Sequence, residues 1–340
     1  MFLNGEEAKH LKNVSTCSTS TVSRLLGKLT QTPALQRHLF RFQAEALRRH
    51  AARLRGQKPQ LVIRVDLTSI AKTGTKLPFV RTYNGVHGIH LVVMHVSIGK
   101  LSFPMGCAIY DPAQEATPIE LALKLIHRMH PYYWGDLSPF LVMDAGFYSA
   151  DALDLLRWWG FEHISFGGRS NLKLRDGRAL KEAGRGEAVE LDTLPGVTLY
   201  VSWVELPRQG KKKRFYVLDT QPGTARTLTT RHKRRWLIES FFKSAKYDFG
   251  LNETRLRTET GIHNWLFLVW LSTSLALFQQ VQAGLTTAKR PAWKLTLSAA
   301  AEQLKESLMP EVVRHHCLTI LARLETRKQP SPPHKHDVAA

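Results

Sequence analysis

Three carboxylates stand where a metal-dependent site can form. Asp66 ends the apolar run LVIRVD, and Asp144 ends the apolar run PFLVMD. A carboxylate at the end of a buried strand is unfavourable unless it is paired with a cation or binds a metal. If the two strands are neighbours in one sheet, both carboxylates reach the same cation, and Glu239 on a later helix can reach it too. We therefore predict that Asp66, Asp144 and Glu239 are catalytic residues and metal ligands.

The ligand type indicates which metal and which reaction. A site built from carboxylate oxygens suits Mg²⁺ or Mn²⁺, which keep water and phosphate oxygens in their other positions. Two such ions can stabilise the attacking and the leaving oxygen of an in-line phosphoryl transfer. The predicted cofactor is therefore Mg²⁺ or Mn²⁺, as two ions.

Glu239 lies in a helical stretch that otherwise carries only positive charge, RHKRRWLIESFFKSAK (residues 231–246). At about 100° per residue, one helix face carries His232, Arg235, Glu239, Lys243 and Lys246. Two interpretations are open. Glu239 forms ordinary i,i+4 ion pairs with Arg235 and Lys243 on a solvated face, or it binds metal while the neighbouring cations grip the phosphates of a bound strand.

Composition narrows the class of partner. The chain of 340 residues has 48 Lys and Arg against 28 Asp and Glu, a net charge of +20. Such an excess favours a polyanionic partner, most often nucleic acid, although a generally basic or ribosome-associated protein is the alternative. The 43% hydrophobic fraction excludes a disordered chain.

Two further features bear on the compartment. Cys17, Cys107 and Cys317 are far apart, so they predict neither a disulfide framework nor a zinc site, and they suit a reducing cytoplasm. The apolar stretch 265–278 is too short to span a bilayer, so we predict a buried core helix and no membrane partner.

The elements that must position the carboxylates follow from the changing hydrophobic period. Residues 60–70, 88–99 and 100–110 predict an antiparallel meander of three strands. Residues 117–130, with Thr117 as a cap before Pro118, and residues 149–160 predict helices. The short apolar runs 138–146 and 161–167 predict buried strands. The order βββαβαβ predicts an α/β fold with a mixed sheet flanked by helices.

The same patterns divide the chain into segments. Residues 1–58 are predicted to be helical and DNA-binding, either as a helix-turn-helix whose second helix begins near Ser18 or as a plain helical hairpin. The other predicted segments are the first part of the catalytic core (59–166), a β-rich insertion (167–228), the second part of the core with the Glu239 helix (229–285), C-terminal helices (286–327) and a disordered tail (328–340).

Taken together, this order resembles the RNase H-like DDE transposases of bacterial insertion sequences. The resemblance covers about residues 60–280 and is closest to the subgroup marked by Tyr-x2-Arg-x3-Glu-x6-Lys, the insertion sequence four family. This chain has His232-x2-Arg235-x3-Glu239-x6-Lys246, and DLTSIAKTG and MDAGFYS resemble the family's contexts for its two aspartates. The departure is His232 in place of Tyr. The resemblance implies that His232 and Arg235 contact phosphates near the cleaved end, and a histidine charge there would depend on pH.

The resemblance also implies a function. The protein would cut double-stranded DNA at the terminal inverted repeats of its element and transfer the freed 3′ ends into target DNA, by a cut-and-paste mechanism. It would act as a homodimer in a synaptic complex, in the bacterial cytoplasm at the nucleoid. Two alternatives remain: an RNase H-like nuclease without strand transfer, and a decayed or domesticated transposase that only binds DNA.

The insertion supplies further DNA-binding candidates. Trp203 lies where the family places an aromatic residue that stacks on a flipped base, and the alternative is an ordinary core tryptophan. The basic run Lys211, Lys212, Lys213 and Arg214 is predicted to contact phosphates at a hairpin tip, and the alternative is a solvated loop.

Overall fold

The computed structural model describes residues 32–286, except 55, 57–58, 75–76, 135–136, 209–210 and 255. The predicted helix-turn-helix near Ser18, the C-terminal helices after residue 286 and the tail 328–340 therefore lie outside the described residues. Within the predicted N-terminal segment, one helix is described, α4 (Thr32–Arg53).

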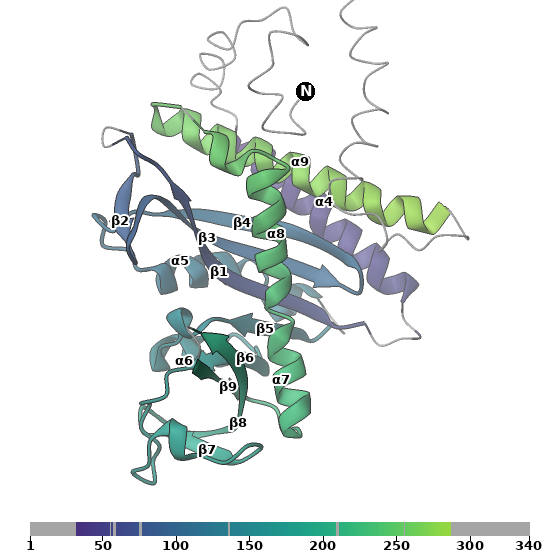
Figure 1. Cartoon of the computed structure of the whole chain (residues 1–340). Coiled ribbons are helices and arrows are strands. Elements are labelled where there is room, and N and C mark those ends of the chain that lie inside the picture. The colour runs from purple at the N-terminus through teal and green to yellow at the C-terminus, as the bar shows by residue number, and fades with distance from the viewer. Residues whose placement is uncertain are drawn as a thin grey trace, which may run out of the picture.

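The strands form one mixed sheet whose centre has the predicted order. The strands of its first half are β1 (Leu61–Ala71), β2 (Arg81–Tyr83), β3 (Val86–Ile98), β4 (Leu101–Tyr110), β5 (Pro139–Met143) and β6 (His163–Gly168). β3 pairs antiparallel with both β1 and β4, whereas β5 pairs parallel with β1 and with β6. The order β4-β3-β1-β5-β6 is that of an RNase H-like fold, so the predicted fold class is confirmed (Figure 1).

The β-rich segment adds three strands to the same sheet. These are β7 (Ala188–Leu191), β8 (Leu194–Arg208) and β9 (Lys211–Asp219). β9 pairs antiparallel with β6, so the sheet continues as β6-β9-β8-β7. The segment therefore extends the edge of the central sheet, as the lower part of Figure 1 shows.

Helices cover both faces of the central strands. The remaining helices are α5 (Pro118–His127), α6 (Ala150–Trp158), α7 (Ala225–Lys233), α8 (Trp236–Tyr247) and α9 (Glu259–Thr286). The predicted Thr117 cap of α5 is present as a capping box with Glu120. α8 crosses one face of the sheet in Figure 1, where Phe241 packs among Leu91 and Val93 of β3.

Alternation along β1 decides which side chains face α8. Leu61, Ile63 and Val65 belong to the main core on the α5 face. Because successive strand residues point to opposite faces, Arg64 and Asp66 lie on the other face, with α8. The strand therefore presents its charged side chains to the helix that carries Glu239.

α9 is the predicted core helix. Its segment Glu259–Gln279 is long and apolar enough to cross a membrane by composition alone, but 67% of its most apolar window is buried inside the protein. α9 packs against β4 and α4. Its apolar surface is thus used for packing within the fold.

The predicted helix over 231–246 is interrupted. α7 ends at Lys233 and α8 begins at Trp236. The amides of Arg234 and Arg235 donate to carbonyls three residues back, those of Arg231 and His232, and so form a tighter turn than an α-helix. Nε of Arg64 on β1 also donates to the Arg234 carbonyl at 2.5 Å. The break between α7 and α8 is therefore accompanied by a contact with a distant strand. The local sequence pattern of residues 231–246 does not reveal this contact.

Candidate active site

Strand pairing brings the two aspartates together. β1 and β5 run parallel, with Val65 opposite Met143. Asp66 follows Val65 within β1, and Asp144 follows Met143 directly after β5. Glu239 comes from α8, which lies over β1. Both Asp144 and Glu239 raise the pKa of Asp66 through like-charge repulsion. Asp144 and Glu239 thus each lie close enough to Asp66 to act on its charge.

Asp66 is the most perturbed of the three. The pKa of its carboxyl is raised to about 6, chiefly by burial and in addition by the charges of Asp144 and Glu239. Arg235 acts in the opposite direction and lowers it. Its side chain is only 13% exposed, and Oδ1 accepts a hydrogen bond from the Leu67 amide at 2.8 Å. A buried carboxylate with a raised pKa in a cluster of like charge is typical of a functional site.

Arg235 joins two of the carboxylates. Its Nη1 donates to Asp66 Oδ2 at 2.5 Å, and its Nη2 donates to Glu239 Oε1 at 2.6 Å. The i,i+4 pair of the first interpretation therefore exists, but the same guanidinium also reaches a strand 169 positions earlier in the chain. Lys243 is exposed and forms no ion pair with any described residue. Arg235 therefore forms an ordinary ion pair with Glu239 and also links this face of α8 to Asp66 on β1.

Asp144 lacks the partners that an ordinary turn aspartate would have. It follows β5 and precedes the short 3₁₀ helix η3 (Ala145–Phe147), and its side chain does not cap that helix. Its half-buried carboxylate accepts no hydrogen bond and forms no ion pair from any residue that the structure describes. A carboxylate without such partners beside Asp66 would be stabilised by a bound cation.

The types of the three donor residues fit a divalent ion. Within the described part of the chain, no three His, Cys, Asp or Glu side chains are grouped as a metal site. Arg235 instead supplies the positive charge between Asp66 and Glu239. The unpartnered oxygens of Asp144 and the all-carboxylate chemistry suit Mg²⁺ or Mn²⁺ once the guanidinium gives way.

His232 lies on α7, with its imidazole against β6. Burial and the neighbouring Arg235 lower the pKa of its imidazole to about 4, although Asp144 and Asp219 act in the opposite direction. Its Nδ1 lies 3.2 Å from Ser165 Oγ on β6. With that pKa the His232 ring is neutral at pH 7, because it lies against the sheet.

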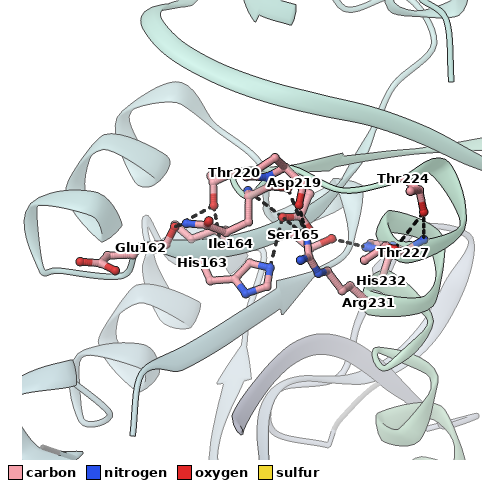
Figure 2. A network of polar contacts seen from close by, with 12 residues as sticks. Glu162, His163, Ile164, Ser165, Asp219, Thr220, Thr224, Thr227, Arg231 and His232 are labelled. Atoms are coloured by element: carbon pink, nitrogen blue, oxygen red, sulfur yellow. Dashed lines mark hydrogen bonds and ion pairs between the residues drawn. The ribbon is translucent and has the colours of Figure 1, made fainter. Parts of the chain in front are cut away.

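A polar network that the sequence did not reveal holds α7 in place (Figure 2). Asp219, fully buried at the end of β9, has His163 Nε2 at 3.2 Å and Arg231 Nη1 at 3.8 Å. Its Oδ1 also accepts a hydrogen bond from the Gln221 amide. Because α7 carries Arg231 and His232, this network sets where the helix meets the sheet. The feature of the sequence that could have indicated this network is the aspartate that ends the apolar run FYVLD.

The remaining DNA-binding candidates lie apart from the carboxylates. Trp203 is on β8, three strand positions from β5, or roughly 14 Å at the usual strand spacing. It is half-buried against Tyr216, with the guanidiniums of Arg185 and Arg214 at 5.1 and 5.0 Å from its ring centroid. Trp203 is therefore neither a fully buried core residue nor part of the carboxylate cluster.

The basic candidates on β9 and α8 have mixed surroundings. Lys211 and Lys212 begin β9 beside the hairpin tip, Lys213 is exposed, and Arg214 pairs with Glu205 at 3.0 Å. Lys246 is half-buried on α8, and burial lowers its pKa. Among the predicted DNA-binding residues whose side chains the structure describes, Arg235 alone contacts the carboxylates directly.

Comparison with known proteins agrees with this geometry. A family model described as the transposase DDE domain matches residues 57–275, which include all three carboxylates. Among solved structures, a piggyBac transposase synaptic complex with hairpin DNA, studied by cryo-electron microscopy, is similar with a TM-score of 0.48 and 14% identity. The match covers 82% of this chain and 60% of that one. No curated protein sequence matches. Since the family model spans more than half of the sequence, the chain belongs to the transposase DDE domain family.

Proposed function

We propose that this protein is the transposase of an insertion sequence, which cuts DNA at the ends of its element and joins the freed 3′ ends to target DNA. The observation that carries the proposal is Asp144, a half-buried carboxylate without a partner among the described residues, next to Asp66 with its raised pKa. Such an arrangement is costly in a structural role and useful in a cation site.

Asp66, Asp144 and Glu239 would hold Mg²⁺ or Mn²⁺, as two ions. When bound, such ions neutralise charge on the reacting phosphate and favour ionisation of the attacking water. The sheet contributes rigidity, because Asp66 lies within β1, Asp144 directly follows the adjacent strand β5, and Glu239 is on a helix packed over β1. Holding reactants on rigid elements supplies much of the rate enhancement in phosphoryl transfer.

The reaction has two balanced steps. A water oxygen attacks the phosphorus at the element end, and the P–O3′ bond breaks, which leaves a 3′ hydroxyl and a 5′ phosphate. The 3′ oxygen then attacks a phosphorus of the opposite strand or the target, one P–O bond forms as another breaks, and a proton passes to the leaving 3′ oxygen. Lys243 and Lys246, together with Arg235 once released from Asp66, would hold the backbone near this site.

The partners follow from the same proposal. Double-stranded DNA with the terminal inverted repeats, and the target DNA, would bind the basic surface that gives the chain its net charge of +20. His232, Trp203 and the run from Lys211 to Arg214 would add contacts. Two copies would pair the element ends in a synaptic complex at the bacterial nucleoid.

A strand-joining assay tests the proposal. The purified protein is incubated with Mg²⁺, a labelled duplex that carries the DNA flanking its gene, and an unlabelled target plasmid. We expect nicked ends followed by label joined to the plasmid or to the opposite strand. Cleavage without joining would identify a nuclease, and binding without any product would identify a DNA-binding protein; either result would reject transposition.

A further inference from the structure

A large cavity opens beside the strand that carries Asp66. Its volume is about 1270 Å³, and it lies between the C-terminal part of α4, the start of β1 and the α7–α8 junction. The side chains that matter here are Arg48, Gln60, Arg64, Ser97, Trp134 and Arg234. This cavity contains none of the three carboxylates of the candidate active site.

The cavity wall is positively charged. Arg48, Arg64 and Arg234 all line it, and no Asp or Glu is among the described residues that do so. The two hydroxyls of Ser97 and Ser138 and the amide of Gln60 add neutral hydrogen-bonding groups. Such a lining suits an anion with several acceptor oxygens.

Arg64 is the deepest of the three arginines. It is 3% exposed, and its Nη1 donates to Ser97 Oγ at 2.9 Å and to the Val62 carbonyl at 3.3 Å. Its Nε donates to the Arg234 carbonyl, so all of these partners are neutral. No described carboxylate pairs with Arg64, and its Nη2 has no hydrogen-bond partner among the described residues. A buried guanidinium without a described counter-ion is unfavourable, so an anion in the cavity would stabilise it.

The other two guanidiniums each lie over an aromatic ring. Arg48 lies over the Trp134 ring, 5.0 Å from its centroid, and Arg234 lies over the Phe140 ring at 5.8 Å. Nη1 of Arg234 also donates to the side-chain oxygen of Gln60. Stacked guanidiniums lose little freedom on binding, so they are well prepared to donate to phosphate oxygens.

The cavity is next to the reaction site along two elements. Arg64 precedes Asp66 by two positions on the same face of β1, or roughly 7 Å, and Arg234 directly precedes Arg235. Adjacent nucleotides of one strand advance about 3.4 Å along a duplex. A phosphate in the cavity would therefore belong to a nucleotide near the reacting one.

We propose that the cavity lined by Arg48, Arg64 and Arg234 is a phosphate-binding pocket that holds the DNA backbone beside the Asp66 site. The proposal rests on the proposed function for its choice of DNA as the ligand. A free phosphate ion offers the same oxygens, so the experiment must separate the two sources.

The test measures DNA affinity without cleavage. Duplex binding is titrated in EDTA over a range of salt concentrations for wild type, Arg48→Gln, Arg234→Gln and the double variant. Arg49→Gln is the matched control, because Arg49 is the next residue of α4, pairs with Glu45 at 2.7 Å and does not line the cavity. Arg64 is left unchanged, because its removal would disturb the packing of β1.

Each cavity variant should lower the slope of log affinity against log salt by about 0.9, and the double variant by about 1.8. Arg49→Gln should leave the slope at its wild-type value. Equal slopes for wild type and the double variant would overturn the proposal.

Inorganic phosphate provides the second arm. If phosphate ions raise the melting temperature of wild type but not of the double variant, while the DNA slopes stay equal, the pocket holds a free anion and the proposal for DNA is wrong. A lowered slope in a protein that never cleaves DNA would keep this pocket and reject the proposed transposition, so the two failures are distinguishable.

Discussion

Arg235 occupies the position between Asp66 and Glu239 that a divalent ion would be expected to fill. Its guanidinium bonds to both carboxylates, and its buried Nε has no partner among the described residues. A cation that is shared by two carboxylates offsets the repulsion that otherwise raises the pKa of Asp66. In the metal-free protein, Arg235 therefore acts as their counter-ion.

Removal of this counter-ion should be costly without metal and less costly with it. Arg235→Gln should lower the free energy of unfolding by about 3 kcal/mol in EDTA, because it leaves buried Asp66 unpaired. Mn²⁺ should then raise the melting temperature of the variant more than that of wild type. Calorimetry in EDTA and in Mn²⁺ measures both effects, and equal Mn²⁺ shifts in the two proteins would contradict the counter-ion role.

His232 should destabilise the protein as the pH falls. Its folded-state pKa of about 4 lies below the ordinary value of 6.5, so the neutral ring favours folding above pH 6.5. That contribution, about 3 kcal/mol at 1.36 kcal/mol per pKa unit, is lost as the pH falls from 6.5 towards 4. Urea unfolding of His232→Gln should show a flatter acid limb than wild type.

Asp66 titrates in an overlapping window with the opposite sign. Because its folded-state pKa of about 6 is raised above 3.8, its contribution favours folding at low pH and is lost as the pH rises towards 6. The comparison of His232→Gln with wild type removes this background, since both proteins keep Asp66. An unchanged acid limb in the variant would show that His232 is not held neutral by burial.

At the scale of elements, the close approach of β6 to the segment after β5 fixes Asp144. A Cβ atom on Gly167 would lie 2.7 Å from the Ala145 backbone nitrogen, whereas a Cβ on Gly146 would meet nothing within 4 Å. Gly167→Ala must therefore push away the residue that follows Asp144. Gly146→Ala adds a Cβ atom in the same short segment without that clash.

Gly167→Ala should lower the free energy of unfolding by about 1–3 kcal/mol, as overpacking does, and should reduce DNA cleavage more than DNA binding. Thermal unfolding and paired binding and cleavage assays test this, with Gly146→Ala expected to match wild type in all three. Full cleavage by a destabilised Gly167→Ala protein would show that the placement of Asp144 is not critical.

The elements that the sequence predicted are those with a strong local pattern. The apolar runs that end at Asp66 and Asp144 predicted β1 and β5, and the Thr117 cap predicted the start of α5. Three features depended on distant contacts and were not predictable from local spacing. These are the pairing of β9 with the edge of β6, the break between α7 and α8 beside Arg64, and the network around Asp219.

The same limit applies to the candidate site. The residue types Asp, Asp and Glu predicted the carboxylate cluster, because a buried carboxylate needs a cation. The expected strand end at Asp66 is wrong, because β1 continues to Ala71 through its pairing with β3. The state of His232 could not be predicted, since its pKa depends on burial against β6. The dual role of Arg235 was equally hidden, because one partner is four residues away and the other is on β1.

At the scale of the whole molecule, a chain with a net charge of +20 places three acidic side chains near one another, from β1, the end of β5 and α8. The surrounding charge favours a polyanion, and the acidic cluster favours a cation that can bridge to it. The two features together account for a protein that binds DNA and acts on its phosphates. Neither feature alone distinguishes an enzyme from a DNA-binding protein.

The most direct test is the rate of Mg²⁺-dependent cleavage by Asp144→Asn on duplex DNA that carries the element ends. Asp144 has no described hydrogen bond or ion pair to lose, so the substitution removes a metal ligand while the fold and DNA binding stay intact. Asp154→Asn, which removes an exposed carboxylate from α6, is the control and should cleave like wild type. We expect Asp144→Asn to bind DNA normally and to give no detectable cleavage. Cleavage by Asp144→Asn at the wild-type rate would contradict it.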